Sequence, residues 1–420
     1  MSRWKRNLIV LCFAQSITLL GFSAYLPFIP YFVQDLGVRD YARATAWMAF
    51  FDSGSALAMM VFAPIWGTLA DRYGRKLMLV RATAAGAALA FLMGLARSPL
   101  QLIILRILQG AFCGTVSAAN TLVATETPEE SLGQWLGIMQ TTQFVGQAAG
   151  PLMGGLLADV LGYRAVFPIS SALMVIALLS IALLVREQSM PRAARRGRLR
   201  LTLSRRSLAE VATGNTMVLL LALACNSFAI AVLSPVLSLY IKSLSADSAH
   251  LGTLAGSIIA VSALTSSISA LFLGRLGDRY GRKRVLLSCV IGAALIYAPQ
   301  ALATNAMQLL VLRAIQGVFM GGIIPTGNAL LAQSTPHDRR GTVFGLATSA
   351  GAGGRALGPI LGAAVANTWG MASTFWVTAS IFGLIAALVA GLVRGRQEPA
   401  AGPEVAPLPT GPGGAGAGGA

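Results

Sequence analysis

Charge is scarce in this chain. Only 11% of its 420 residues are Asp, Glu, Lys or Arg, whereas soluble domains carry roughly 25%. Hydrophobic residues make up 55%, and they fall in runs close to the roughly 20 residues that cross about 30 Å of hydrocarbon. The shortage of charge excludes an ordinary soluble domain and predicts a membrane protein.

Histidine and cysteine are also scarce. The two histidines, His250 and His337, lie at the ends of apolar runs, and the four cysteines lie inside such runs at no metal-ligand spacing. The sequence contains no Gly-x-x-x-x-Gly-Lys-Ser/Thr loop that would cradle a nucleotide phosphate. These absences argue against a metal centre, a disulfide, an enzyme and direct drive by ATP, and we expect no cofactor.

Twelve apolar segments are predicted to cross the membrane as α-helices. Their expected ranges are 8–33, 45–67, 77–96, 101–125, 133–158, 165–185, 215–240, 251–273, 285–303, 307–333, 342–366 and 371–393. Several exceed the minimum length, which indicates tilted helices or ends that project into water.

The basic residues are distributed unevenly between the two ends of these segments. If the N-terminus is cytoplasmic, 24 Lys and Arg residues fall on the cytoplasmic side and 5 on the other. The positive-inside rule therefore predicts that both termini are cytoplasmic. The formal net charge of +17 is then explained by topology and by contact with anionic membrane lipids. We expect no nucleic-acid partner, since no basic patch is interleaved with aromatic residues.

The two halves of the chain repeat each other. "GTLADRYGRK" from Gly67 returns as "GRLGDRYGRK" from Gly274, 207 residues later, and "RILQG" returns as "RAIQG" with the same shift. "GPLMGG" from Gly150 returns as "GPILGA" from Gly358 with a shift of 208. Because each half contributes six spans, the halves are predicted to be parallel repeats around an axis along the membrane normal.

These observations divide the chain into four parts. Residues 1–185 and 214–395 are each expected to form an all-α bundle of six transmembrane helices. Residues 186–213 are predicted to be a basic cytoplasmic linker. Residues 396–420, rich in Pro, Gly and Ala, are predicted to be a disordered cytoplasmic tail.

The repeated decapeptide combines glycine and charge at the cytoplasmic end of a helix. Its glycines suit a tight turn, and its aspartate suits the positive end of a neighbouring helix. We predict that it latches the two bundles in one state and releases them in another; a plain basic turn is the alternative. The predicted gating residues are Gly67, Asp71, Arg72, Gly74 and Arg75 in the first half and Asp278, Arg279 and Arg282 in the second.

Together these motifs resemble the signatures of a known family. The decapeptide after the second span, Arg-x-x-Gln-Gly in the fourth and Gly-x-x-x-Gly-Pro-x-x-Gly-Gly in the fifth are similar to motifs of the major facilitator superfamily. "WKRNLIV" from Trp4, "GRKLML" from Gly74 and "RAVF" from Arg164 further resemble MdtG-type multidrug exporters of its twelve-helix drug:proton antiporter group. The resemblance implies a major facilitator fold and alternating access, in which two six-helix bundles rock about a central site.

The motif of the fifth span is similar to one associated with proton-coupled antiporters. It comprises Gly146, Gly150, Pro151, Gly154 and Gly155. Three of its glycines follow at four-residue steps on one helix face, and its proline would bend the helix. Close packing and a bend between moving halves are the two interpretations. The resemblance also implies that Asp71 braces the outward-open state against the eleventh span, with Asp278 as a partial counterpart.

Ionisable residues inside a membrane are functional candidates because they are costly to keep there. Asp52 is the carboxylate that lies clearly within a predicted span, and Arg106 lies at a similar depth in the fourth span. We predict that they pair and act in proton coupling, since protonation of Asp52 would free the arginine. A structural Asp52 that reaches the outer headgroups is the alternative. The first span departs from many relatives, because it has no carboxylate before Asp35.

Further polar and aromatic side chains in the spans are candidates for substrate contacts. Arg355 has no charged repeat mate, Asn120 and Asn328 are related by the repeat, and aromatic rings can stack on a flat drug. The predicted set is Tyr25, Phe112, Asn120, Phe228, Asn328 and Arg355. Packing and hydrogen bonding within the protein are the alternative roles.

The sequence therefore predicts a secondary transporter of the bacterial cytoplasmic membrane that acts as a monomer. We expect it to export lipophilic or amphipathic compounds, including antibiotics, in exchange for protons. A same-fold transporter for one metabolite, such as a sugar, an amino acid or a siderophore, is one alternative. A non-transporting membrane sensor is the other.

Overall fold

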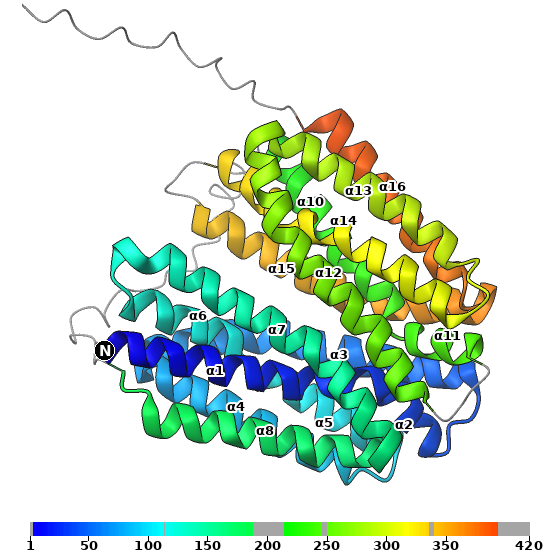
Figure 1. Cartoon of the computed structure of the whole chain (residues 1–420), viewed down its shortest axis with the longest axis horizontal. Coiled ribbons are helices and arrows are strands. Elements are labelled where there is room, and N and C mark those ends of the chain that lie inside the picture. The colour runs from blue at the N-terminus through cyan, green and yellow to red at the C-terminus, as the bar shows by residue number, and fades with distance from the viewer. Residues whose placement is uncertain (1–2, 113, 188–213, 246–249, 336–339, 394–420) are drawn as a thin grey trace, which may run out of the picture.

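The computed structural model describes residues 3–112, 114–187, 214–245, 250–335 and 340–393, whose regular structure is entirely helical (Figure 1). The helices are α1 (Arg3–Ala24), η1 (Leu26–Phe28), α2 (Ile29–Asp35), α3 (Tyr41–Tyr73), α4 (Arg75–Gly94), α5 (Pro99–Ala111), α6 (Thr115–Glu126), α7 (Glu129–Leu161), α8 (Tyr163–Leu184), α10 (Gly214–Leu233), α11 (Leu237–Leu244), α12 (Leu251–Tyr280), α13 (Arg282–Gln300), α14 (Ala306–Gln333), α15 (Arg340–Trp369) and α16 (Ser373–Leu392). The predicted linker from residue 188 onward and the predicted tail lie outside the described residues.

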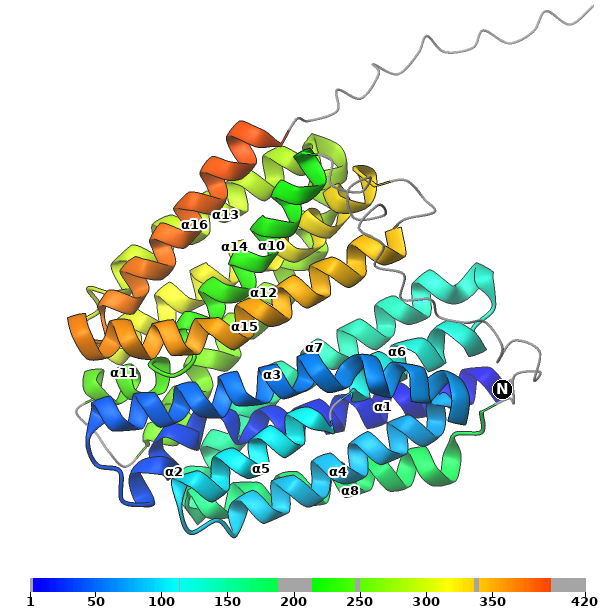
Figure 2. The same cartoon turned by 180° about the vertical axis from the view of Figure 1, so that it is seen from behind.

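These helices make twelve spans in two bundles of six, as the sequence predicts. Within the described ranges, ten stretches are long and apolar enough to cross a membrane, and α13 and α15 supply the other two spans. Helices α1–α8 form one bundle and α10–α16 the other, which Figures 1 and 2 show as two separate groups. Buried side chains such as Tyr25, Phe167 and Phe382 fill the bundle interiors. The chain is a multi-pass membrane protein.

Three spans are interrupted by short segments that the predicted ranges treat as continuous. The first span consists of α1, η1 and α2, with Pro27 in η1, and the seventh consists of α10 and α11, with Pro235 between them. The fourth breaks between α5 and α6, where Gly114 has a φ of +122°. Proline lacks a backbone donor and glycine readily adopts a positive φ, so these residues end one helical segment and allow the next to begin.

Matching contacts in the two halves make the sequence repeat visible. Lys76 Nζ donates to the carbonyl oxygen of Ala182 at 2.8 Å, and Lys283 Nζ donates to that of Ala390 at 3.0 Å. Each lysine thus satisfies a carbonyl at the end of the sixth helix of its own bundle.

Glycines let the fifth span approach the first at the backbone. The three at four-residue steps, Gly146, Gly150 and Gly154, all face α1. A Cβ on Gly150 would lie 2.6 Å from the carbonyl oxygen of Leu20. One on its repeat mate Gly358 would lie 2.8 Å from the carbonyl oxygen of Phe228 in α10. In this state these glycines pack helices closely within each bundle.

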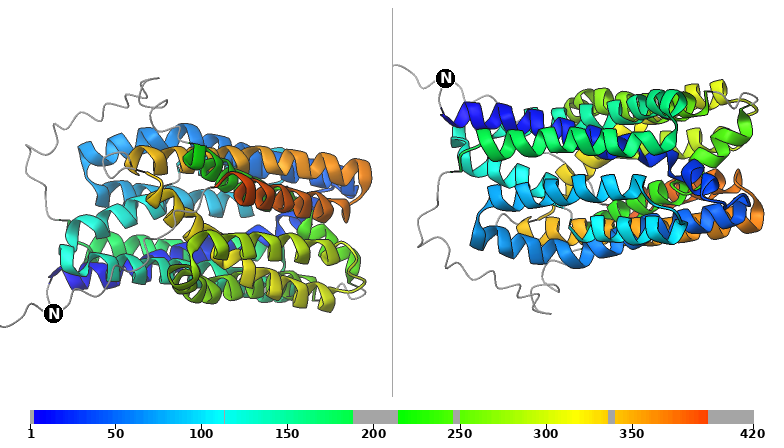
Figure 3. Two further views of the ribbon diagram at one scale, coloured as in Figure 1. Left: turned by 90° about the horizontal axis from the view of Figure 1, so that it is seen from above. Right: turned by 90° about the horizontal axis from the view of Figure 1, so that it is seen from below.

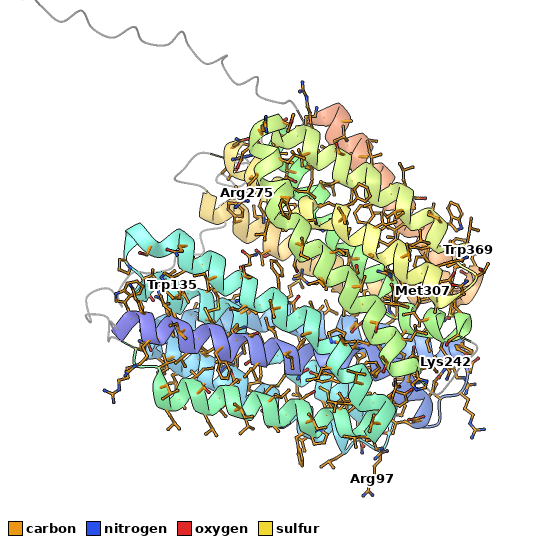
Figure 4. The ribbon with its side chains drawn as sticks, viewed as in Figure 1. Arg97, Trp135, Lys242, Arg275, Met307 and Trp369 are labelled. Carbon is orange, nitrogen blue, oxygen red and sulfur yellow. The ribbon has the colours of Figure 1, made fainter. Side chains whose placement is uncertain are left out.

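The bundles converge at one end of the molecule and diverge at the other. The closed end is the one where Lys242 Nζ of α11 donates to Gln34 Oε1 of α2 at 2.6 Å. The open end is the opposite one (Figures 1 and 2), and Figure 3 shows the N-terminal end of α1 there. Figure 4 shows Trp135 and Arg275 there, on separate bundles, with Lys242 at the closed end.

Candidate functional site

A cavity of about 460 Å³ lies between the two bundles. Its lining residues are Phe22, Asp52, Ser55, Ala56, Met59, Arg106, Gln109, Gly110, Ser227, Ile230, Ala231, Ser234, Ile324, Ala352, Arg355 and Pro359. Most are apolar or small, and the three charged ones are Asp52, Arg106 and Arg355, which the sequence singles out. Among the described residues, no group of His, Cys, Asp and Glu side chains is arranged to hold a metal ion.

Asp52 links the two bundles beside the cavity. It projects from α3, and its carboxylate accepts a hydrogen bond from Ser234 Oγ, which directly follows α10 of the other bundle. A hydrogen bond to a charged group contributes about 1.5–3 kcal/mol, against about 0.5–1.5 kcal/mol for a neutral one. The strength of this contact therefore depends on the charge of Asp52.

Arg106 is held by its own bundle. Its Nη1 donates to Gln109 Oε1 at 2.7 Å, and the same oxygen accepts the hydroxyl of Tyr25 at 3.0 Å. The guanidinium lies 4.9 and 5.0 Å from the ring centroids of Phe22 and Phe51. Because only 8% of the residue is exposed, the cation is fixed in place.

Asp52 and Arg106 line one cavity but do not form the predicted ion pair in this state. Asp52 is bonded to Ser234 and Arg106 to Gln109, and in the part of the chain that the structure describes no salt bridge joins the two. Equal depth in the membrane brings both side chains to the cavity, but it does not select their hydrogen-bond partners.

Arg355 enters the cavity from α15 of the second bundle. Its side chain is exposed, and within the described ranges it makes neither a hydrogen bond nor a salt bridge. Its repeat mate is Gln147, so the first half has no equivalent cation. A guanidinium whose five donors bond none of the described residues is available to a polar or anionic group of a ligand.

Comparisons with known proteins agree with this arrangement. The model of the Major Facilitator Superfamily matches residues 11–245 and 219–412. The chain belongs to the major facilitator superfamily. It is 34% identical over 380 residues to a multidrug resistance protein MdtG of Rahnella sp. (strain Y9602), covering 90% of this chain and 91% of the relative. An MdtG of Salmonella typhimurium (strain LT2) is 33% identical over 386 residues, covering 90% and 93%. The predicted resemblance is confirmed.

Solved structures share the fold of this superfamily member at low sequence identity. The nucleoside transporter NupG matches with a TM-score of 0.76 at 15% identity, covering 94% of this chain and 100% of that chain. A bacterial homologue of the human lysosomal transporter Spinster matches with a TM-score of 0.76 at 16% identity, covering 95% and 100%. These two likenesses show the fold alone. Family membership and the MdtG relatives make the chain a transporter with small-molecule substrates rather than an enzyme.

The three aromatic residues predicted to contact substrate do not line the described cavity of this transporter. Tyr25 is 1% exposed and lies behind the lining, where its hydroxyl bonds Gln109 and its ring lies 5.9 Å from that of Phe22. Phe112 lies 5.9 Å from the ring of Trp66, and Phe228 packs against Gly354. Their role in binding stays a prediction.

The two predicted asparagines lie each within its own bundle. Asn120 Oδ1 accepts Gln143 Nε2 of α7 at 3.0 Å, which is a hydrogen bond between two helices of the first bundle. Asn328 is half-buried in α14, and neither residue lines the described cavity. A contact with substrate stays a prediction for both.

The loop motif of the superfamily forms matching turns at the open end of each bundle. Gly74 follows α3 with a φ of +101°, and Gly281 follows α12 with a φ of +94°. Arg72 and Arg279 each lie 5.5 Å from the ring of the tyrosine that follows them. Both turns need glycine, since other residues rarely adopt such a φ.

The charges of the two loops have different partners. In the second half, Arg282 forms an exposed salt bridge with Asp278 at 2.7 Å. In the first half, Glu187 accepts the backbone N–H groups of Arg75 and Lys76 at 2.9 and 3.0 Å. Glu187 thus caps the start of α4 from the end of the sixth span.

Two members of the first loop, Gly67 and Asp71, bear on the predicted latch. A Cβ on Gly67 would meet open space. Asp71 belongs to α3, and its side chain lies outside the described part of the structure. Latching by this loop stays a prediction for a state in which the open end closes.

Among the residues that join the bundles, the sequence prediction missed Ser234 and Asp159. Ser234 bonds Asp52. The signal for Ser234 in the sequence is the neighbouring Pro235, which marks a helix break and which the shift of 208 pairs with Pro27, at the break in the first span. Asp159 lies within α7, one residue beyond the predicted fifth span, and its carboxylate bonds the other bundle. Hydropathy alone does not identify such contacts.

Proposed function

We propose that this protein exports lipophilic or amphipathic compounds, including drugs, in exchange for protons, by alternating access of the cavity between its bundles. The observation that carries the proposal is the cavity wall, which is mostly apolar and contains one carboxylate and two arginines. Apolar walls with few polar groups suit broad selectivity, because apolar burial is not directional. The names of the MdtG relatives support the same substrate class.

The open end is proposed to face the cytoplasm of a bacterial inner membrane, together with both termini. The loops that carry the decapeptide and its repeat lie at this end, and they hold Arg72, Arg75, Lys76, Arg279, Arg282, Lys283 and Arg284. Such an excess of cations supports a cytoplasmic location. The described state is then open inward, and the closed end is the outer one.

Asp52 is the proposed proton site. In its ionised form the carboxylate accepts the Ser234 hydroxyl and holds the bundles together beside the cavity. A proton on Asp52 removes the charge and weakens that bond, so protonation favours separation of the bundles there. Arg106, fixed by Gln109, keeps a positive charge in the cavity in both forms.

Arg355 is the proposed contact for a polar or anionic group of the substrate. The apolar part of the same molecule would lie against side chains such as Phe22, Met59 and Ile230, which line the cavity with it. All of these residues come from one chain. The proposed function therefore requires only a monomer.

Drug-dependent proton movement in proteoliposomes tests the proposal. Purified protein is reconstituted with a pH-sensitive dye inside the vesicles, and a lipophilic dye that carries a polar or anionic group is added outside. We expect proton movement with the wild-type protein and only background movement with Asp52→Asn, because an amide does not take up the proton.

The matched control is Asp40→Asn on the same helix. Asp40 caps α3 by accepting the N–H of Arg43 at 2.9 Å, and asparagine caps a helix about as well, so exchange stays at the wild-type rate. Undiminished exchange in Asp52→Asn would exclude Asp52 as the proton site. If the wild-type protein moves no protons with any of a panel of dyes, detergents and antibiotics, drug–proton exchange itself is wrong.

A further inference from the structure

Asp159, near the end of α7, reaches the first turn of α12 in the other bundle. Its Oδ1 accepts the backbone N–H of Gly252 at 2.8 Å, and its Oδ2 accepts that of Thr253 at 2.7 Å. The N–H groups in the first turn of a helix have no acceptor within that helix, and they carry the positive end of its dipole. A carboxylate that accepts two of them makes a strong, charge-assisted contact.

The repeat places a second contact at the equivalent positions, with the two bundles exchanged and with different donors and acceptors. Asn367 follows Asp159 by 208 residues; it accepts Thr45 Oγ1 at 2.8 Å and donates from Nδ2 to the carbonyl oxygen of Ala42 at 3.2 Å. Thr45, near the start of α3, precedes Gly252 by 207 residues. The end of the fifth span therefore holds the start of the eighth, while the end of the eleventh holds the start of the second.

The two arms of this crossed contact differ in charge and in exposure. Asp159 is a half-buried carboxylate on backbone donors, whereas Asn367 is an exposed neutral amide. A Cβ on Gly252 would lie 2.8 Å from the carbonyl oxygen of Gly155, so two glycines bring the helices close enough to shield Asp159. Charge-assisted hydrogen bonds are roughly twice as strong as neutral ones, so the Asp159 arm is the stronger.

Other contacts at the closed end join shorter segments. The Tyr31 hydroxyl donates to the carbonyl oxygen of Ser238 at 2.6 Å, and Lys242 donates to Gln34. These residues lie on α2 and α11, which follow the breaks in the first and seventh spans. The crossed contact instead joins the long helices α7, α12, α3 and α15, whose relative tilt sets the separation of the bundles at both ends.

We propose that Asp159 and Asn367 form a crossed latch that holds the closed end shut, with Asp159 as the stronger arm. Removal of the Asp159 charge then shifts the protein toward a state in which this end opens and the opposite end closes. The inference rests on the proposed alternating access, and it assigns to Asp159 a gating role separate from proton uptake at Asp52.

Distances between spin labels on the full chain in lipid nanodiscs test the latch. The natural cysteines are replaced, and labels are placed on Arg97→Cys and Met307→Cys at the closed end of the two bundles. A second pair, Gln134→Cys and Arg275→Cys, reports the open end. For Asp159→Asn we expect the population with a long Arg97–Met307 distance to grow about tenfold, and the Gln134–Arg275 distance to shorten in that population.

Two further variants separate the latch from a general loss of charge or of folding. Asn367→Ala removes the exposed arm and is expected to shift the same populations by about twofold to threefold, in the same direction. Asp40→Asn, the carboxylate-to-amide change at the same end within one bundle, is expected to leave both distances unchanged.

The outcomes distinguish the latch from the proposed function. Distances in Asp159→Asn that equal those of Asp40→Asn overturn the latch, even if the wild-type protein exchanges drug for protons in vesicles. A shifted distance in Asp159→Asn and in Asn367→Ala supports the latch, even if no tested drug moves protons. A shift in which both ends open together overturns the latch, because in an alternating cycle one end closes when the other opens.

Discussion

The two halves of the molecule place the same arginine in different surroundings. Arg106 and Arg313 are repeat mates, and each donates from Nη1 to the glutamine three residues later, at 2.7 and 3.1 Å. Arg106 lines the cavity with Asp52, whereas Arg313 is 7% exposed and its glutamine donates to the hydroxyl of Tyr297. The repeat mate of Asp52 is Ile259. The repeat thus preserves the scaffold and the arginine itself, while Asp52 and Arg355 of the cavity stand at positions where the halves differ.

Substitution of the two arginines tests this difference most strongly. Arg106→Gln removes one of the two cations of the cavity, the one on the same bundle as Asp52, and we expect drug-driven proton flux to fall by more than about tenfold. Arg313→Gln is expected to keep most of the flux, and to keep or raise the thermal stability, because Nε and Nη2 of Arg313 are buried with no hydrogen-bond partner among the described residues. Equal losses of flux in the two variants would contradict a functional difference between the halves.

Alanine at repeated glycines tests the shared scaffold instead. Gly150→Ala and Gly358→Ala each place a Cβ within 2.8 Å of a neighbouring helix, and we expect each to lower the free energy of unfolding by about 1–3 kcal/mol. The matched controls are Gly137→Ala and Gly345→Ala, repeat mates whose Cβ atoms would meet open space. Thermal unfolding in detergent measures the effect, and a loss in the controls as large as in the first pair would refute close packing as its cause.

The smallest expected effect concerns the cap on α4. Glu187 has Gly395 as its repeat mate, so the sequence offers no second carboxylate of this kind. Loss of a cap costs about 0.5–2 kcal/mol, and Glu187→Gln is expected to speed hydrogen exchange at the amides of Arg75 and Lys76 by up to about tenfold. Exchange at the start of α13 serves as the internal control, and unchanged exchange at α4 would exclude the cap.

Much of this architecture is predictable from the sequence. Apolar runs locate all twelve spans, because the length of a helix that crosses hydrocarbon is set by the bilayer. The shift of 207 to 208 residues predicts two equivalent bundles. Ionisable side chains are costly inside a membrane, and this cost marks Asp52, Arg106 and Arg355 as functional candidates. The structure brings all three to one cavity.

Contacts between the bundles are what the sequence does not predict. Asp52 is bonded to Ser234 rather than to Arg106, and the choice depends on where α10 ends in this state. Asp159 falls just outside the predicted fifth span, because hydropathy locates the membrane boundary. It does not report the backbone N–H groups at the start of α12, in the other half, that need an acceptor. Partners of this kind change as the bundles move, so no local pattern encodes them.

The crossed contacts of Asp159 and Asn367 also bear on how such a chain can arise. Two identical subunits around a two-fold axis make an isologous interface. In such an interface position i of one subunit contacts position j of the other, and position j of the first contacts position i of the second. In this chain the subunits are its two halves, and neither position finds its partner within its own half. A single six-helix unit therefore carries both surfaces of a dimer, and fusion of two copies leaves one copy of the contact free to acquire a charge that the other lacks.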